Sequence, residues 1–363
     1  MVAAFYISGH GFGHATRDIE VIRAVGRLRP GVQVVVRTAA PPWLFDGLAN
    51  VRVSPALTDT GVVQRDSLHI DIERTADDAA AFYADFDRHV ASEAARLIAE
   101  STCVVVGDIP PLAFAAAARA GIPSVAVANF TWDWIYEHTP QFQQRAPAAL
   151  PVIRRAYGEA TSALRLPMNG GFDAMAERTR DIPLIARRST LTRAGARRLL
   201  GLPSDETIVL ASFGGHGLTM DYERIAATNG FTLLITDYEG GQAGHRHRLR
   251  CFARKALPAL GVDYPDLVAA ADVVVAKPGY GIVSECIANG TALVHASRGS
   301  FIEQEVIVAA MPRLLRCQFI EQDDLAAGRW QASVDAVLAQ PAPAHSVGLD
   351  GAEQAALAIL EHL

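Results

Sequence analysis

Three glycine-rich segments hold the residues of this sequence that are best suited to chemistry. They are Gly9–His14 (GHGFGH), Phe213–Gly217 (FGGHG) and Lys277–Glu285 (KPGYGIVSE), and each directly follows an apolar run. Glycine lets the chain turn tightly, so backbone N–H groups can approach a ligand closely. A helix that begins at such a turn favours an anion at its N-terminus. The pattern therefore predicts a ligand that carries phosphate.

The first segment combines glycines with a histidine. Gly11 and Gly13 would present backbone N–H groups, and His14 would lie near the N-terminus of the following helix, where a general base is well placed. Asp108 ends another apolar run, VVVGD, and is the second candidate for the base. Both residues also have a purely structural interpretation, as loop or helix caps.

No cofactor or metal is expected at these segments. The third glycine of the first segment is misplaced for the G-x-G-x-x-G pattern, and Thr38 stands where a dinucleotide site needs an acidic residue, so a nicotinamide cofactor is disfavoured. His10 and His14 are four residues apart, but no third metal ligand or supporting side chain is spaced nearby.

The third segment has the residue types that bind a nucleotide. Gly279 and Gly281 would let a diphosphate reach the helix N-terminus, and Lys277 would add a positive charge. The carboxylate of Glu285, one turn into the helix, would accept hydrogen bonds from a ribose diol; the alternative is an ordinary capped helix with a surface glutamate. Two glycines of the second segment would also donate to the diphosphate: Gly214 and Gly215.

Two further polar segments follow apolar runs. The first segment is Ser297–Gln304 (SRGSFIEQ). Here Arg298 would neutralise a leaving group, and Glu303 and Gln304, at a helix start, would form hydrogen bonds with sugar hydroxyls. Each of these could equally be a cap or a solvated side chain. In the second, Asn129–Trp134 (NFTWDW), two tryptophans would suit a wall that stacks on a sugar or packs between domains.

The elements that must position these residues alternate between short apolar runs and helix-period stretches. Runs of this kind are typical of strands buried on both faces of a parallel sheet. The pattern predicts an α/β fold made of two Rossmann-like domains that face each other. We expect strands at Val2–Ser8, Val32–Thr38, Val51–Val53, Val104–Gly107, Ser124–Ala128, Thr207–Ser212, Thr232–Thr236, Asp272–Ala276, Thr291–His295 and Leu314–Cys317. We expect helices at His14–Leu28, Ala76–Glu100, Leu112–Ala120, Ile282–Asn289, Glu303–Ala310, Asp323–Ala339 and Gly351–Leu363.

Glycines and a proline interrupt the periodicity between Asn169 and Arg188, so we place the domain boundary there. The expected domains are residues 1–180, on the acceptor side, and 181–345, on the nucleotide side. Residues 346–363 are expected to form a last helix that packs back on the first domain.

Composition excludes several classes of protein. The 363 residues are 50% hydrophobic and carry a net charge of −6, which disfavours disorder and a nucleic-acid partner. Four scattered cysteines indicate a reducing compartment. With no targeting segment and no long apolar run, a cytoplasmic location is expected. The basic run His245–Arg250 is interpreted as a solvated face, with contact to phosphate or peripheral contact to anionic lipid as the alternative.

In this order, the motifs resemble the GT-B superfamily of glycosyltransferases over nearly the whole chain. The closest likeness is to the glycosyltransferase-like N-terminal region of plant arabinokinases and their bacterial relatives. It rests on five strings: SGHGFGHATR (Ser8–Arg17), NFTWDWIY (Asn129–Tyr136), YPDLVAAAD (Tyr264–Asp272), KPGYGIVSE (Lys277–Glu285) and DDLAAGRW (Asp323–Trp330). The phosphate loop of the arabinokinase's sugar-kinase part, P-x-x-x-G-L-x-S-S-A, does not occur, so kinase activity is not expected.

A more distant resemblance is to the bacterial N-acetylglucosaminyltransferase of peptidoglycan synthesis. It implies that His14 ends the first glycine-rich loop at the site and that Glu285 binds ribose. It also implies that a uracil lies at the loop ending in Val262 and Tyr264, and that Glu303 and Gln304 contact the sugar.

The leading hypothesis is therefore an inverting, metal-independent glycosyltransferase that moves a sugar from a nucleotide sugar, with a uridine diphosphate sugar favoured, to an acceptor hydroxyl. The alternatives are a nucleotide-sugar 2-epimerase and a non-catalytic sugar- or nucleotide-binding regulatory module. Acceptor contacts are expected from the loops Ser54–Arg74 and Tyr136–Pro151. The sequence does not indicate the sugar, the acceptor or the oligomeric state.

Overall fold

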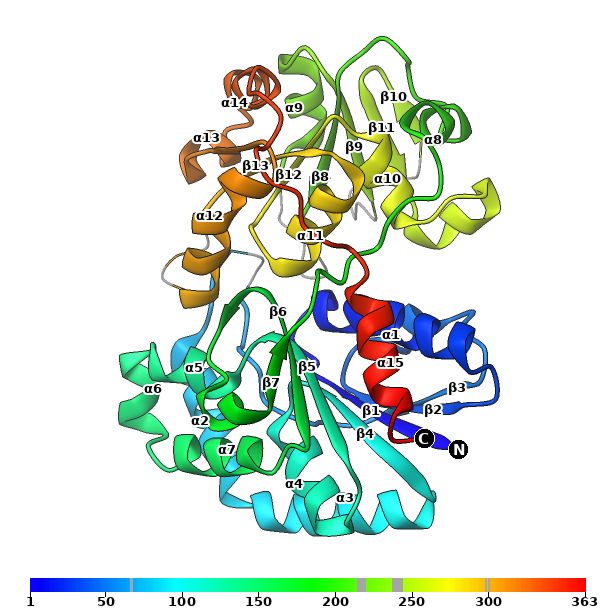
Figure 1. Cartoon of the computed structure of the whole chain (residues 1–363). Helices are drawn as coiled ribbons and strands as arrows, with labels where there is room; N and C mark the ends of the chain where they lie inside the picture. The colour runs from blue at the N-terminus through cyan, green and yellow to red at the C-terminus, as the bar shows by residue number, and fades with distance from the viewer. Residues whose placement is uncertain (66–67, 214–219, 237–243, 298, 300) are drawn as a thin grey trace.

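The computed structural model of the chain describes residues 1–65, 68–213, 220–236, 244–297, 299 and 301–363. Two sheets of mainly parallel strands, one above the other in Figure 1, each carry helices on both faces. Gly214, Gly215 and Arg298 lie outside the described residues.

The first sheet has seven strands in the order β3-β2-β1-β4-β5-β6-β7, and every neighbouring pair is parallel. Residues 3–7 at its centre are fully buried, which explains their unbroken apolar sequence. The last two strands of this order, β6 and β7, were not predicted. The strands are β1 (Val2–Ile7), β2 (Gln33–Thr38), β3 (Val51–Pro55), β4 (Thr102–Asp108), β5 (Ser124–Phe130), β6 (Ser162–Gly170) and β7 (Thr179–Asp181).

The helix expected over Ala76–Glu100 is two helices that meet at Asp85, whose backbone leaves the helical region. The helical segments around the first sheet are α1 (Phe12–Leu28), η1 (Pro42–Phe45), α2 (Ile72–Ala84), α3 (Phe86–Ala99), α4 (Pro111–Ala120), α5 (Trp132–Glu137), α6 (Pro140–Arg145), α7 (Ala149–Gly158) and η2 (Asp173–Arg178).

The second sheet has the order β10-β11-β9-β8-β12-β13-β14, and only the β10–β11 pair is antiparallel among these strands. That hairpin contains the basic run His245–Arg250, for which no strand was predicted. The strands are β8 (Ile208–Ser212), β9 (Thr232–Thr236), β10 (Gly244–Arg246), β11 (Leu249–Phe252), β12 (Val273–Ala276), β13 (Ala292–His295) and β14 (Cys317–Phe319).

The expected helix Asp323–Ala339 is also two helices, because Gly328 between them has a φ of 70°. The strand expected at Leu314–Cys317 begins only at Cys317, since the preceding helix continues to Leu314. The remaining helical segments are α8 (Arg193–Leu199), α9 (Tyr222–Thr228), η3 (Arg254–Leu260), α10 (Tyr264–Ala270), α11 (Tyr280–Asn289), α12 (Ile302–Leu314), α13 (Gln322–Ala326), α14 (Gln331–Leu338) and α15 (Gly351–Leu360).

The last helix, α15, lies against α1 of the first half (Figure 1). The chain reaches it alongside the segment that leaves β7, where Leu184 N donates to Gly348 O at 3.0 Å. The boundaries at residues 180 and 345 remain predictions. None of the described helices is long and apolar enough to span a membrane.

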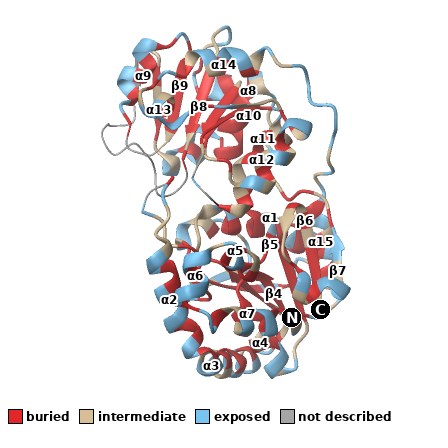
Figure 2. Ribbon diagram, turned by 90° about the vertical axis from the view of Figure 1, so that its left-hand side faces the viewer, coloured by how far each residue is buried: buried red, intermediate tan, exposed pale blue. Residues whose placement is uncertain are grey.

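Both sheets place their first strand near the middle, so the strand order reverses between β1 and β4 and between β8 and β12. In open α/β sheets, ligands bind outside the carboxyl ends of the strands at this reversal. The three glycine-rich segments follow β1, β8 and β12 in the sequence, and Asp108 ends β4. Figure 2 shows the strands of both halves buried, with the exposed surface on the outer helix faces.

Candidate active site

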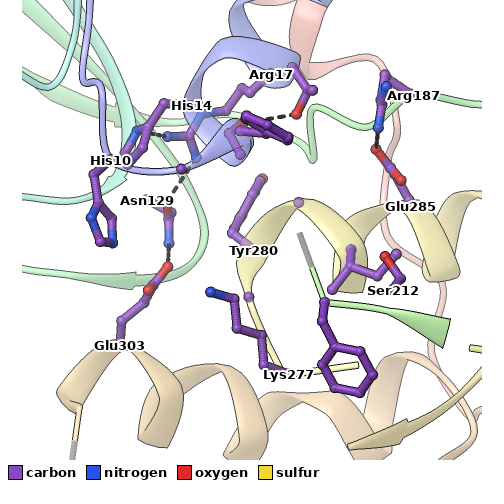
Figure 3. A pocket seen from close by; sticks show the side chains of 18 of the residues that line it. His10, His14, Arg17, Asn129, Arg187, Ser212, Lys277, Tyr280, Glu285 and Glu303 are labelled. Carbon is purple, nitrogen blue, oxygen red and sulfur yellow. Dashed lines mark hydrogen bonds and ion pairs between the residues drawn. The ribbon is translucent and has the colours of Figure 1, made fainter. Parts of the chain in front are cut away.

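A cavity of about 170 Å³ lies between the two halves at these strand ends. We call it the central cavity (Figure 3). The structure brings to it nine of the residues expected from the sequence: Gly11, Gly13, His14, Tyr264, Lys277, Gly279, Gly281, Glu285 and Glu303.

His14 is oriented by a buried carboxylate. Gly11, with a φ of 72°, precedes α1 and lets the chain turn from β1 into the helix, which places His14 in the first turn. The His14 Nδ1 atom lies 2.9 Å from Oδ1 of Asp108, whose exposed fraction is 0%. When Nδ1–H donates to this carboxylate, Nε2 carries the lone pair and is free to accept a proton.

Arg17, one turn after His14, holds the same carboxylate. Its Nε and a terminal nitrogen donate to the two oxygens of Asp108 at 2.8 and 2.6 Å, and its other terminal nitrogen donates to Asn129 Oδ1 at 2.8 Å. Burial raises the pKa of Asp108, but the charges of Arg17 and His14 outweigh burial and hold the pKa below its usual value. Asp108 is thus an ionised carboxylate that does not line the cavity. Of the two candidates for the general base, only His14 faces the cavity.

Glu285 lies on α11, behind the glycine turn that ends in Gly279, and is 4% exposed. Nε and a terminal nitrogen of Arg187 both lie 2.6 Å from Glu285 Oε1 (Figure 3). Burial raises the pKa of Glu285, and the charge of Arg187 only partly opposes the shift. Arg187 comes from the segment between the two sheets, and sequence reasoning missed it.

One aromatic ring and two guanidinium groups cluster on the wall of the central cavity. The guanidinium carbon atoms of Arg187 and Arg254 lie 5.3 and 4.9 Å from the ring centroid of Tyr264. The Tyr264 hydroxyl is 2.5 Å from Ser212 Oγ, at the end of β8. Val262, which was expected to contact the uracil together with Tyr264, is buried and does not line the cavity.

Side chains from the two halves touch across the central cavity. Asn129 Nδ2 donates to Glu303 Oε1 at 3.4 Å, and Lys277 Nζ donates to Gln64 Oε1 at the same distance. A Cβ atom on Gly281 would lie 3.5 Å from Gly13 Cα, so the two glycine turns are in contact. The structure is therefore a closed arrangement of the two halves.

Of the expected residues that the structure describes, three do not line the cavity: Asp108, Val262 and Gln304. Gln304 does not line the cavity, because its amide points back to Ser297 Oγ at 3.3 Å. Arg298, Gly214 and Gly215 are outside the described residues, so their expected roles are neither supported nor opposed. Among the described residues, no group of three or more histidine, cysteine or acidic side chains could hold a metal ion.

Comparison with solved structures identifies the architecture. A kitacinnamycin glycosyltransferase matches all of this chain and 99% of its own length with a TM-score of 0.61 at 18% identity. VinC, a glycosyltransferase solved with dTDP, matches all of this chain and 95% of its own with a TM-score of 0.57 at 14% identity. A Polygonum tinctorium UDP-glucosyltransferase that glucosylates indoxyl matches 99% of this chain and 92% of its own, with a TM-score of 0.59 at 13% identity. The chain has the GT-B fold, which confirms the expected fold class.

The sequence comparison names one particular relative. An L-arabinokinase of Arabidopsis thaliana is 30% identical over 366 residues, which is 98% of this chain and 34% of the relative. The chain thus spans about a third of that protein, and the resemblance inferred from the motifs is confirmed. No protein-family model matches the sequence.

Proposed function

We propose that the chain transfers a sugar from a nucleotide sugar to an acceptor hydroxyl, with inversion and without a metal ion. The observation that carries this proposal is the His14–Asp108 pair on one side of the central cavity, opposite Lys277 and the N-terminus of α11 on the other. A general base and a site for a leaving diphosphate thus face each other in one cavity.

The donor would lie on the second half. Backbone N–H groups at Gly279 and Gly281, the α11 dipole and Lys277 would stabilise the diphosphate. Glu285 would accept hydrogen bonds from the ribose, with Arg187 holding its carboxylate in place. The nucleobase would lie beside the Tyr264 cluster. UDP is favoured by the sequence resemblance, and dTDP is the nucleotide bound in VinC.

The acceptor would come from the first half. His14 Nε2 would take the proton as the acceptor O–H bond breaks, and the acceptor oxygen would form a bond to the anomeric carbon. The bond from that carbon to the diphosphate would break, and the electron pair would leave on the phosphate oxygen. Asp108 would stabilise the imidazolium that forms. Attack from the face opposite the leaving group inverts the configuration.

Donor entry requires the central cavity to widen. Its volume of about 170 Å³ is below the range of about 300–1,000 Å³ that small-molecule sites usually occupy. Opening would break the weak contacts across the cavity, from Asn129 to Glu303 and from Lys277 to Gln64. Closing on the donor would then exclude water and align the acceptor.

A thermal-shift screen of UDP, dTDP and other nucleotides tests the donor site, because a ligand of the folded state raises the apparent melting temperature. The matching nucleotide sugar is then incubated with and without acceptors. Nucleotide release that depends on an acceptor supports transfer. Epimer or free nucleotide formed without an acceptor would indicate an epimerase, and binding without turnover over a broad acceptor panel would indicate a binding module.

A further inference from the structure

A buried carboxyl group that the mechanism does not use lies next to Asp108. Asp18 is four residues after His14 on α1, so the two side chains share one face of the helix. Asp18 is fully buried, and among the described residues no N–H or O–H group donates a hydrogen bond to either of its carboxyl oxygens. An ionised carboxylate that has lost water and gained no donor is strongly unfavourable. The surroundings of Asp18 therefore favour a protonated, uncharged carboxyl group.

Arg17 does not supply the missing donor, although it directly precedes Asp18. Its Nε and one terminal nitrogen donate to the two oxygens of Asp108, at 2.8 and 2.6 Å, and its other terminal nitrogen donates to Asn129 Oδ1 at 2.8 Å. Burial and the negative charge of Asp108 raise the pKa of Asp18 well above its usual value, and the charge of Arg17 only partly opposes the shift. The guanidinium of Arg17 thus compensates the charge of Asp108 rather than a charge on Asp18.

The carboxyl groups of Asp18 and Asp108 are in hydrogen-bonding contact. Two ionised carboxylates are both acceptors, so this contact requires a proton on one of them. Asp108 is the ionised partner, because it accepts hydrogen bonds from His14 and, twice, from Arg17. A carboxylate has about four sites for accepted hydrogen bonds, and these three bonds leave one site for Asp18. The contacts thus favour a proton on Asp18, with its O–H donating to Asp108.

We propose that Asp18 is a positioning residue of the active site, which carries a proton at neutral pH and donates a hydrogen bond to Asp108. The inference rests on the proposed function and adds a residue to the support of its general base. The hydrogen bond fills the remaining acceptor site of Asp108 and so fixes the carboxylate that orients His14. A negative charge on Asp18 would instead favour the imidazolium form of His14, which cannot take a proton from the acceptor hydroxyl. A neutral Asp18 therefore holds Asp108 in place and leaves His14 able to act as a base.

The proton is tested by carbon-13 NMR of the carboxyl groups in protein labelled only at aspartate, so that the glutamates give no signal. At about pH 8, ordinary aspartates are ionised, and so is Asp59, whose pKa is about 6. We expect one aspartate carboxyl signal to remain at the chemical shift of the protonated acid. Asp18→Asn should remove this signal, and Asp59→Asn, the matched control at another buried aspartate, should leave it in place. If the native chain shows no protonated aspartate, or if the signal persists in Asp18→Asn, the proposal is overturned; the native spectrum decides even where a variant does not fold.

The positioning role is tested by the rate of acceptor-dependent nucleotide release in Asp18→Asn and Asp18→Leu. Asn has the shape of Asp and can still donate a hydrogen bond, whereas Leu is of similar size and donates none. We expect Asp18→Leu to be at least about tenfold slower than Asp18→Asn, because it loses a hydrogen bond to a charged group. UDP should bind equally to both variants, since Asp18 does not line the central cavity. Equal rates would overturn the positioning role. If no protein shows turnover but the NMR signal is present, the proposed function fails while the proton on Asp18 stands.

Discussion

His14 Nδ1 lies 2.9 Å from Asp108 Oδ1, although 94 residues separate them in the chain. The contact joins the first turn of α1 to the carboxyl end of β4, which is paired with β1. Because the strand pairing fixes both backbone positions, the histidine is oriented before any ligand binds. The proposed chemistry depends on this preorganised pair and on the cation-bearing turn of α11 across the cavity.

Replacing Arg17 by methionine should destabilise the fold. Asp108 would lose two short hydrogen bonds while fully buried, and its pKa would rise. We expect the free energy of unfolding to fall by about 3–5 kcal/mol, the usual cost of breaking a buried ion pair. Urea denaturation measures it. The control is Arg23→Met on the same helix, whose partner Glu20 is at the surface, and it should cost no more than about 1 kcal/mol. Equal losses in both variants would contradict this account of Arg17.

Glu285→Gln should weaken nucleotide binding. The amide keeps the shape of the side chain but removes the charge that would accept hydrogen bonds from the ribose. Hydrogen bonds to charged groups contribute about 1.5–3 kcal/mol, so we expect UDP to bind about 10- to 100-fold more weakly by calorimetry. Glu305→Gln, at an exposed position on α12, is the matched control. Unchanged affinity in Glu285→Gln would remove this residue from the donor site.

Asp59 should make stability depend on pH. Burial raises the pKa of Asp59 to about 6, although hydrogen bonds from Ser8 and Trp132 oppose the shift. The folded state thus binds this proton more tightly than the unfolded state, and the stability it contributes is lost as pH rises from 3.8 through about 6.

Asn cannot ionise, so Asp59→Asn does not lose this stability as the pH rises. The free energy of unfolding of the variant minus that of the native chain should therefore rise by about 2 kcal/mol between about pH 4 and about pH 7. Chemical unfolding of both proteins across this interval measures the difference. A difference that stays constant with pH would show that Asp59 titrates normally.

The sequence predicted best those site residues whose position depends on a neighbouring strand and turn. A glycine turn after a buried strand of a parallel sheet lies at the carboxyl edge of that sheet. His14, Lys277 and Glu285 therefore all line the central cavity, as expected. Helix ends were less predictable: the backbone at Asp85 and Gly328 breaks two stretches whose periodicity continues across the break.

The sequence could not reveal partners that depend on tertiary contacts. Arg187 meets Glu285 across 98 residues, and Asn129 meets Glu303 across 174, with no pattern to link either pair. Arg17 did carry a signal, since it lies three residues after His14 and therefore on the same helix face.

The rate of acceptor-dependent nucleotide release by His14→Ala tests the central claim most directly. It is measured with the donor and acceptor found in the screens, beside the native chain and the control His345→Ala, whose histidine is exposed and does not line the central cavity. Loss of a general base should lower the rate by about 10²- to 10⁴-fold with nucleotide affinity unchanged, while the control keeps the native rate. A native rate in His14→Ala would contradict the account.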